Sequence, residues 1–407
     1  MKAVQFTFSY PRYALGLALG HWFPSVLWSG ASCTVMREVP EPGLLGPDWV
    51  KIKTRLGGIC GTDLGNIYLK TSPYYSPFSS MPFTIGHENV GTITELGSNM
   101  KGWSIGQRVV VNPILSCVTR GVDDLCEFCA RGEINLCQRF TEGKLAPSHS
   151  IGLGSRETGG SWSPSFVAHS SQLYAVPEQI SDEKAMMVEP FCIGLHAVLK
   201  DFPSDAETIL ILGAGTVGLT TLAALRALGS KARILVSARY ETQAEAARKL
   251  GANEVIRRDL YRQVAQLTGA KLLKTLIGKQ VVLGGVDRVY ECTGSDRSLD
   301  DANRLAHAGG KVILVGVPGI AKGIDWTAIF SQELQVIGST EYTKAERWQG
   351  KSWHCFDLAL SLMANGKADI GWMISRKYAL QDYKRALSDL AQKGSQGIIK
   401  AAFEFTS

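Results

Sequence analysis

The hexapeptide GAGTVG at residues 213–218 constrains the fold of this chain more than any other feature. It follows the apolar run TILIL and opens the helical pattern TVGLTTLAALRALG, so it predicts a strand, a glycine turn and a helix. In that context a G-x-G-x-x-G turn is the fingerprint of a dinucleotide-binding unit. The first glycine permits the tight turn, the second lets the backbone approach a pyrophosphate, and the third lets helix and strand pack closely. The alternative is a glycine turn that binds no ligand.

The residues of the turn that we expect to contact the cofactor lie at a helix N-terminus, which favours negative charge. They are Gly213, Gly215, Thr216, Val217 and Gly218. Further apolar strand patterns alternate with helical ones until about residue 340, as in KARILVSAR, QAEAARKLGA, DRVYECTG and GGKVILVGVPG. This alternation predicts an α/β fold with a doubly wound parallel sheet.

The remainder of the 407 residues predicts a second domain. Residues 1 to about 185 are rich in Gly, Pro, Cys and short β-branched runs, which is typical of an irregular, mainly β domain. After about residue 341 the helical runs WHCFDLALSLMANG and YKRALSDLAQKG are followed by a last strand, GIIKAAFEF.

The end of the second strand of the nucleotide-binding unit selects the cofactor. An acidic residue there would bind the ribose hydroxyls of NAD, but the strand ends in VSAR, and the first acid, Glu241, lies too far along. Ser237 can donate a hydrogen bond, and Arg239 offers a guanidinium group suited to phosphate. The sequence therefore favours NADP(H), with NAD(H) as the alternative if Arg239 is merely solvated. Thr293, in ECTG at a later strand end, is also assigned to the cofactor site.

Four of the nine cysteines crowd into one segment, in the order Cys117, Cys126, Cys129 and Cys137. Four thiolates satisfy the tetrahedral preference of a closed structural zinc site. Asp123 is an alternative fourth ligand, although the preference of zinc for soft ligands favours Cys117. Crowded cysteines in a long chain indicate a metal rather than disulfides, and so a reducing, cytoplasmic compartment.

No Asp, Glu, Lys or Arg lies between Arg12 and Arg37. The stretch YALGLALGHWFPSVLW there has the composition of a signal peptide or a membrane span. His21 and Pro24 shorten its continuous apolar run, and the strand-like KAVQF precedes it. We therefore expect a buried or interface insertion with one or two short helices, and no membrane span. The net charge is +6 without any cluster of Lys and Arg, which argues against a nucleic-acid partner.

Three further motifs contain metal-ligating side chains. Thiolate, imidazole and carboxylate together can hold zinc and leave one position open for a substrate. Each residue alone would more often be structural, so only their joint occurrence indicates a catalytic metal. The residues are Cys60, Thr62 and Asp63 in GICGTD, His87 and Glu88 in IGHENVG, and Glu189, Cys192 and His196 in MVEPFCIGLHAV.

These motifs, the cysteine cluster and GAGTVG occur in an order that resembles the zinc-containing medium-chain alcohol dehydrogenase family, especially its polyol, sugar and threonine dehydrogenase branch. The resemblance runs from KAVQF to the last strand. It implies a GroES-like, β-rich catalytic domain at residues 1–188 with a structural zinc lobe at about 117–137. It further implies a Rossmann nucleotide-binding domain at 189–340 and a return to the catalytic domain at 341–407. Two zinc ions per chain and a homodimer or homotetramer are also implied.

Carried over by position, Cys60, His87 and Glu189 resemble the ligands of the catalytic zinc. Glu88 resembles the nearby carboxylate that can enter or leave the zinc shell. Asp63 resembles the residue that orients His87. The seven extra residues VTRGVDD between the first two cysteine positions depart from the family pattern and leave the choice between Cys117 and Asp123 open.

The implied reaction is hydride exchange between NADP(H) and a small alcohol, polyol or sugar, or the matching carbonyl compound. Thr62 resembles the hydroxyl that touches the substrate oxygen. Gly65 stands where many relatives have a histidine that passes the proton outward, so the proton would leave through Thr62, a ribose hydroxyl and water, or through Glu88. One alternative is a zinc-independent quinone or enone reductase of the same fold. Another is a non-catalytic NADPH-binding or membrane-attached protein.

Overall fold

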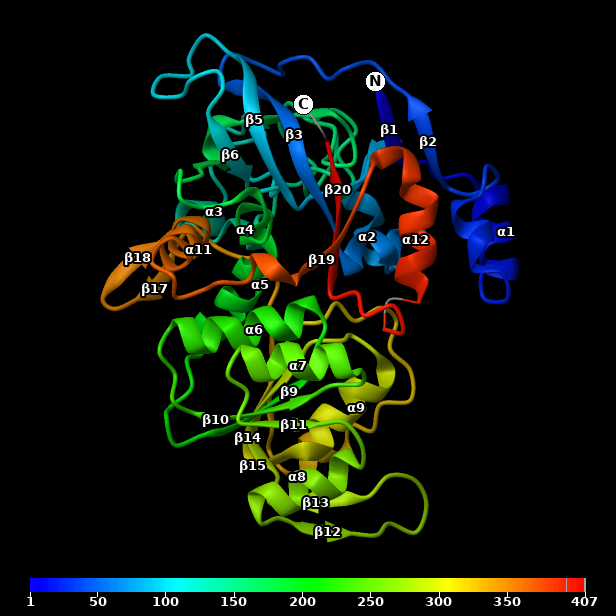
Figure 1. Ribbon diagram of the computed structural model, residues 1–407, viewed down its shortest axis with the longest axis vertical. Coiled ribbons are helices and arrows are strands. Elements are labelled where there is room, and N and C mark those ends of the chain that lie inside the picture. Colours follow the sequence, from blue (N-terminus) through cyan, green and yellow to red (C-terminus); the bar gives the residue numbers. More distant parts are fainter. Residues whose placement is uncertain (393, 406–407) are drawn as a thin grey trace.

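The computed structural model describes residues 1–392 and 394–405. Figure 1 shows two bodies, a β-rich one that contains both ends of the described chain and an α/β one that contains its middle. Helix α5 (Val188–Leu199) leads from the first body into the second, and strand β20 (Lys400–Glu404) closes the chain in the first. The α/β body is thus inserted in the β-rich body, whose last elements come from the C-terminal part of the chain.

The α/β body contains a six-stranded, all-parallel sheet. Its strand order is β11-β10-β9-β14-β15-β16, the doubly wound order with a switch point between the first and fourth strands of the unit. The strands are β9 (Thr208–Leu212), β10 (Arg233–Ser237), β11 (Glu254–Ile256), β14 (Val286–Glu291), β15 (Ala306–Leu314) and β16 (Gln335–Gly338). The helices are α6 (Thr216–Ala227), α7 (Glu241–Lys249), α8 (Leu260–Thr268), α9 (Asp296–Leu305) and α10 (Thr327–Ser331), and a hairpin of β12 (Lys271–Leu273) and β13 (Val281–Leu283) is added. The predicted fold class is confirmed.

The glycine turn before α6 is as tight as its sequence predicts. Gly213 has a φ of 98°, a conformation that favours glycine. A Cβ atom on Gly218 would lie 1.8 Å from the carbonyl oxygen of Gly213, so only glycine lets the helix start this close to the strand.

The β-rich body is built on a mainly antiparallel sheet with the order β19-β20-β3-β5-β6-β8, and β7 also pairs with β3. The strands are β3 (Trp49–Ile59), β5 (Asn89–Leu96), β6 (Arg108–Val111), β7 (Ser165–His169), β8 (Leu173–Ala175) and β19 (Ile374–Tyr378). A second sheet has the order β2-β1-β4, with β1 (Lys2–Phe6), β2 (Thr34–Glu38) and β4 (Phe83–Thr84). Short helices lie between the strands of this body: α2 (Gly61–Ile67), α3 (Glu127–Ala130) and α4 (Asp182–Met186). The C-terminal part of the chain adds helices α11 (Cys355–Ala364) and α12 (Tyr383–Ala391). It also adds a hairpin of β17 (Glu346–Trp348) and β18 (Lys351–Trp353).

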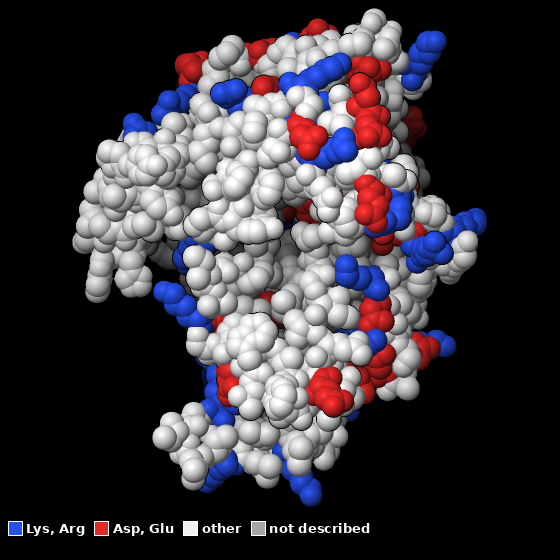
Figure 2. Space-filling model, turned by 180° about the vertical axis from the view of Figure 1, so that it is seen from behind, with Lys and Arg blue, Asp and Glu red and all other residues white. Residues whose placement is uncertain are grey.

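The uncharged segment between Arg12 and Arg37 forms helix α1 (Tyr10–Leu19) and the 3-10 helix η1 (Pro24–Trp28), as expected for an insertion with short helices. Leu27 and Trp28 are buried, and η1 lies against α12. The other side of the insertion exposes several large apolar side chains and forms an uncharged projection, at the right of Figure 1 and the left of Figure 2. Among the described helices, none is both long and apolar enough to cross a membrane.

Candidate active site and metal centres

Three predicted residues converge where β3 ends and β5 begins. The ligand atoms of Cys60, His87 and Glu88 all lie within 4.8 Å of one another. Cys60 directly follows β3 and is the N-cap of α2, while His87 and Glu88 immediately precede β5. Because β3 pairs with β5, residues separated by more than 25 positions meet at one edge of the sheet. A thiol, an imidazole and a carboxylate in this arrangement fit a zinc ion.

Asp63 fixes two members of this group. One carboxylate oxygen accepts a hydrogen bond from the Cys60 backbone N–H at 2.8 Å, and the other lies 3.2 Å from Nδ1 of His87. Burial lowers the pKa of His87, but the charges of Asp63 and the Cys60 thiolate outweigh burial, and the pKa is raised well above its usual value. The contact with Asp63 occupies Nδ1, so Nε2 of His87 is the nitrogen available to a metal.

A buried ion pair between Lys400 and Glu88 was not predicted from the sequence. Nζ of Lys400 contacts the Glu88 carboxylate, and the side chains are only 2% and 1% exposed. Burial lowers the pKa of Lys400, but the charges of Glu88 and the Cys60 thiolate outweigh burial. The pKa is therefore raised above its usual value, and the ammonium group is charged. A lysine within the apolar run GIIKAAFEF was the signal for this pair, because a charge in a buried strand requires a partner.

Glu189 lies outside the compact group that contains Glu88. Its Oε1 accepts a hydrogen bond from the Tyr342 hydroxyl at 3.1 Å, and this contact holds the carboxylate. Burial raises the pKa of Glu189 to about 7, and the charges of His87, Glu88 and Lys400 act on it as well. Of the four residues predicted at the catalytic zinc, Cys60, His87 and Glu88 therefore lie in the compact group and Glu189 does not, and the choice of third ligand stays a prediction.

The other side chains of these motifs have different neighbours. Thr62 Oγ1 lies 3.8 Å from Cys60 Sγ, so the hydroxyl adjoins the proposed metal position. His196 is buried with its Nδ1 2.7 Å from Glu346, and the carbonyl of Cys192 lies 3.6 Å from the thiol of Cys355. Neither Cys192 nor His196 belongs to the compact group.

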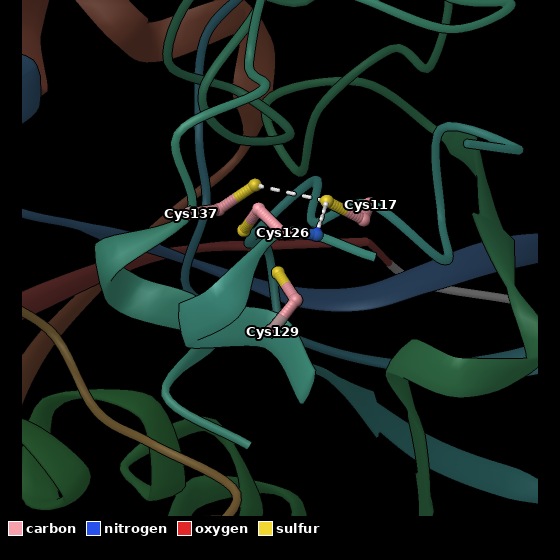
Figure 3. A group of neighbouring side chains, drawn as sticks. All are labelled: Cys117, Cys126, Cys129 and Cys137. Atoms are coloured by element: carbon pink, nitrogen blue, oxygen red, sulfur yellow. Dashed lines mark hydrogen bonds between the residues drawn. The ribbon is translucent and has the colours of Figure 1, made fainter. Parts of the chain in front are cut away.

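The four predicted cysteines of the lobe point at one another, as Figure 3 shows. Their sulfur atoms all lie within 4.8 Å of one another, and Sγ of Cys117 is 3.6 Å from Sγ of Cys137. The hydrogen bond from the Cys129 thiol, with further donors, lowers the pKa of Cys137 to about 5. Asp123 is exposed and does not belong to the group. The donor set fits a closed tetrahedral zinc site.

The lobe also holds the segment that carries Tyr342. The Asn135 side chain donates to the carbonyl of Thr340 at 2.9 Å, and the carbonyl of Gly132 accepts hydrogen bonds from the Thr343 hydroxyl at 2.7 Å and the Lys344 N–H at 2.9 Å. The cysteine lobe therefore contacts the segment whose Tyr342 hydroxyl donates to Glu189.

The glycine turn offers space to a ligand. A Cβ atom on Gly215 would meet no atom within 4 Å, in contrast to one on Gly213, which would lie 2.3 Å from Cγ2 of Thr293. The Thr216 hydroxyl, on the first turn of α6, donates to the carbonyl of Ile399, so the turn adjoins the segment that leads to Lys400. Val217 follows on the same turn and packs against the core. This open backbone fits a pyrophosphate at the helix N-terminus.

The second strand of the unit ends as the sequence predicts. Ser237 is half-buried, and Arg239 is exposed and makes no ion pair within the described ranges 1–392 and 394–405. Glu241, the nearest acid, is held by Arg248 at 3.0 Å and by Arg257.

Comparisons with known proteins agree with this architecture. Residues 46–178 match the family model of the alcohol dehydrogenase GroES-like domain, and residues 216–357 match that of zinc-binding dehydrogenases. The chain is 30% identical over 353 residues to L-idonate 5-dehydrogenase of Vitis vinifera, which covers 86% of this chain and 87% of the relative. It is 27% identical over 365 residues to sorbitol dehydrogenase of Arabidopsis thaliana, with 88% and 89% covered. These relatives and the fold define a dehydrogenase.

A solved structure gives the same result. It is described as a zinc-binding dehydrogenase from Sinorhizobium meliloti 1021 bound to NADP, and it matches with a TM-score of 0.71 and 27% identity, covering 91% of this chain and 95% of that one. The chain belongs to the zinc-containing medium-chain alcohol dehydrogenase family, and it is an oxidoreductase that acts on CH–OH groups.

Proposed function

We propose that this enzyme transfers a hydride between NADP(H) and a small alcohol, polyol or sugar, or the matching carbonyl compound, with a zinc ion at the Cys60 group. The observation that carries this proposal is the convergence of Cys60, His87 and Glu88 within 4.8 Å. We further propose that Cys60 and His87 hold the ion and that Glu88 and Glu189 are alternative third ligands. The four lobe cysteines would hold a second, structural zinc ion.

The chemistry divides between the cofactor, the metal and the chain. A zinc ion bound here would act as a Lewis acid that eases deprotonation of an alcohol and polarises a carbonyl group. The Thr62 hydroxyl would exchange a proton with the substrate oxygen, and its position 3.8 Å from Cys60 Sγ supports this role. Lys400 balances the charge of Glu88 and so limits how readily that carboxylate leaves its position.

The preference for NADP(H) rests on residues at the end of β10. The Arg239 guanidinium group would bind a 2′-phosphate, and the nearby Ser237 hydroxyl would donate a hydrogen bond to it. Glu241, which could otherwise repel that phosphate, forms ion pairs with Arg248 and Arg257. Thr293 would line the cofactor site from the end of β14, opposite Gly213. All nine cysteines are free thiols, which supports a reducing compartment such as the cytoplasm, and the family resemblance supports a homodimer or homotetramer.

Two variants test the role of the metal. Cys60→Ser and His87→Ala should abolish turnover, because each removes a ligand, while NADPH binding stays largely intact. NADPH binding is measured by fluorescence titration and metal content by elemental analysis. Normal turnover in either variant would refute the proposed zinc role. Turnover that is indifferent to metal removal would favour the zinc-independent reductase, and failure to oxidise NADPH with any carbonyl compound would favour the non-catalytic alternative.

A further inference from the structure

The uncharged insertion formed by α1 and η1 is anchored on the β-rich body by its inner side. Leu27 and Trp28 of η1 are buried. A Cβ atom on Gly16 of α1 would lie 2.7 Å from Cδ1 of Leu69, which follows α2, and 3.2 Å from Cδ2 of Leu27. The 3-10 helix η1 also contacts β2 and α12. Packing therefore sets the position of the insertion, and α1 projects away from the body (Figure 1).

The outer side of the insertion is apolar and open to solvent. The side chains of Tyr10, Trp22 and Phe23 are 80%, 75% and 61% exposed, and that of Leu17 is 56% exposed. No Asp, Glu, Lys or Arg lies between residues 12 and 37, so this surface carries no formal charge of its own. Exposed apolar side chains that gather in one place on a soluble protein mark a surface that associates with something else. The proposed hydride transfer makes no use of it.

Basic side chains border this apolar surface. They lie on α1, after α2, on β2 and on α12, the elements that pack together at the insertion, and none forms an ion pair within residues 1–392 and 394–405. They are Arg12, Arg37, Lys70, Lys384 and Arg385. In Figure 2 the projection is white, and blue side chains lie at its margins.

Fewer acids accompany these five cations on the same elements. Glu38 lies 3.8 Å from the N-terminal ammonium group, and Asp389 accepts a hydrogen bond from the Tyr378 hydroxyl at 2.8 Å. Asp382, before α12, is the third acid. The surroundings of the insertion are therefore positive, and they complement a partner that is apolar inside and negative at its surface.

A bilayer with anionic lipids has this combination of properties. Tryptophan and tyrosine favour the boundary between headgroups and acyl chains, and lysine and arginine near that boundary are attracted to anionic headgroups. A second copy of this chain fits less well. A two-fold contact would bring the same surface of both copies together, so the five cations of each would repel those of the other.

We propose that the insertion docks this enzyme on the surface of a lipid bilayer that contains anionic lipids. Leu17, Trp22 and Phe23 would enter the boundary between headgroups and acyl chains, while the five cations would face the headgroups. The attachment is peripheral, because none of the described helices is both long and apolar enough to cross a membrane. Docking of this kind places the enzyme at a membrane without taking any group from the proposed metal centre or the nucleotide site.

The test measures how the full-length, zinc-loaded enzyme partitions onto sucrose-loaded vesicles that are pelleted by centrifugation. Vesicles of phosphatidylcholine with phosphatidylserine should bind it at least about fivefold more strongly than vesicles of phosphatidylcholine alone, and high salt should reduce the difference. The double variant Trp22→Ser/Phe23→Ser should lower partitioning onto the anionic vesicles by at least about tenfold. Lys384→Gln/Arg385→Gln should lower it by at least about fivefold.

The hairpin of β12 and β13 supplies matched controls in the other body. Leu276 and Ile277 at its tip are exposed, and Lys271 and Lys274 are exposed without an ion pair to a described residue. Leu276→Ser/Ile277→Ser and Lys271→Gln/Lys274→Gln should therefore leave partitioning unchanged. Melting temperature and turnover in solution check the fold of every variant. Leu17→Asn, a single change, replaces Trp22→Ser/Phe23→Ser if that variant does not fold.

Several results would overturn the proposal. One is a wild-type enzyme that stays in the supernatant with anionic vesicles. Another is an equal loss of binding in the hairpin variants and the insertion variants, which would assign the binding to overall positive charge. A third is sedimentation equilibrium in which wild type self-associates, the Trp22→Ser/Phe23→Ser enzyme does not, and both bind vesicles equally, because a second copy then covers this surface. Vesicle binding requires no turnover, so these results leave the proposed function unaffected.

Discussion

The hydroxyl of Tyr342 donates a hydrogen bond to Glu189 at 3.1 Å, and both side chains are buried. This bond sets where the Glu189 carboxylate lies relative to Cys60, His87 and Glu88. Partners of metal ligands commonly alter metal affinity or activity by about 10–100-fold when they are removed. We therefore expect the loss of this hydrogen bond to alter how Glu189 approaches a metal bound at Cys60 and His87.

Replacing Tyr342 should impair catalysis without unfolding the enzyme. In Tyr342→Phe the ring still fills its buried place, but Glu189 loses its donor, so we expect kcat/KM to fall by about tenfold or more. Steady-state kinetics and zinc content by mass spectrometry measure the effect. Tyr378→Phe, which removes a comparable bond to Asp389 outside the site, serves as the control. Equal activity in Tyr342→Phe and wild type would show that catalysis does not depend on the hydrogen bond from Tyr342 to Glu189.

Arg239 should decide between the two nicotinamide cofactors. Charge-assisted hydrogen bonds contribute about 1.5–3 kcal/mol each, so Arg239→Ala should weaken NADP binding by about 10–100-fold and leave NAD binding little changed. Fluorescence titration with both reduced cofactors measures the ratio. Arg248→Ala removes a nearby arginine that pairs with Glu241 and should preserve the preference for NADP. A preference for NAD in the wild type would contradict the assignment of Ser237 and Arg239.

Loss of metal from the cysteine lobe should reduce activity at a distance. Cys126→Ser removes one of four proposed ligands, and the lobe then no longer holds Thr340 and Thr343 in place. We expect zinc content to fall from about two ions per chain to about one, together with a lower melting temperature and at least a tenfold loss of kcat/KM. Cys33→Ser, at a buried cysteine outside both metal groups, is the control. Full activity of a Cys126→Ser enzyme that retains one zinc ion would show that catalysis does not depend on the metal of the lobe.

His149 should make the folded enzyme sensitive to acid. Burial, opposed only by the charge of Cys137, lowers the pKa of His149 to about 4. The unfolded chain then binds a proton at higher pH than the folded chain, so stability is full above about pH 6.5 and falls as the pH decreases towards 4. Between pH 7 and pH 5, wild type should lose about 1–2 kcal/mol more unfolding free energy than His149→Gln in urea denaturation. An identical loss in both proteins would exclude this origin.

Local sequence patterns were sufficient for the fold class. The alternation of strands and helices after about residue 206 and the turn at 213–218 reflect short-range requirements of backbone and packing, and the structure confirms the doubly wound sheet. The spacing of the four lobe cysteines also predicted that they form one group, because they lie within one short segment. Their sulfur atoms do lie within 4.8 Å of one another.

Contacts between distant segments could not be predicted in the same way. Lys400 reaches Glu88 only because β20 pairs with β3, with Ala401 opposite Ile59, and a sequence does not reveal that register. The hydrogen bond from Tyr342 to Glu189 joins residues 153 positions apart, and no spacing rule identifies it.

The pairing of Lys400 with Glu88 has a consequence for how the enzyme is made. The two residues are 312 positions apart, so a ribosome that adds about 5–20 residues per second adds the second one about 15–60 s after the first. Until then the nascent β-rich domain lacks an interior strand of its larger sheet, while the nucleotide-binding sheet has already left the exit tunnel complete. Biogenesis therefore assembles the domain encoded in the middle first and finishes the domain that encloses the reacting groups last.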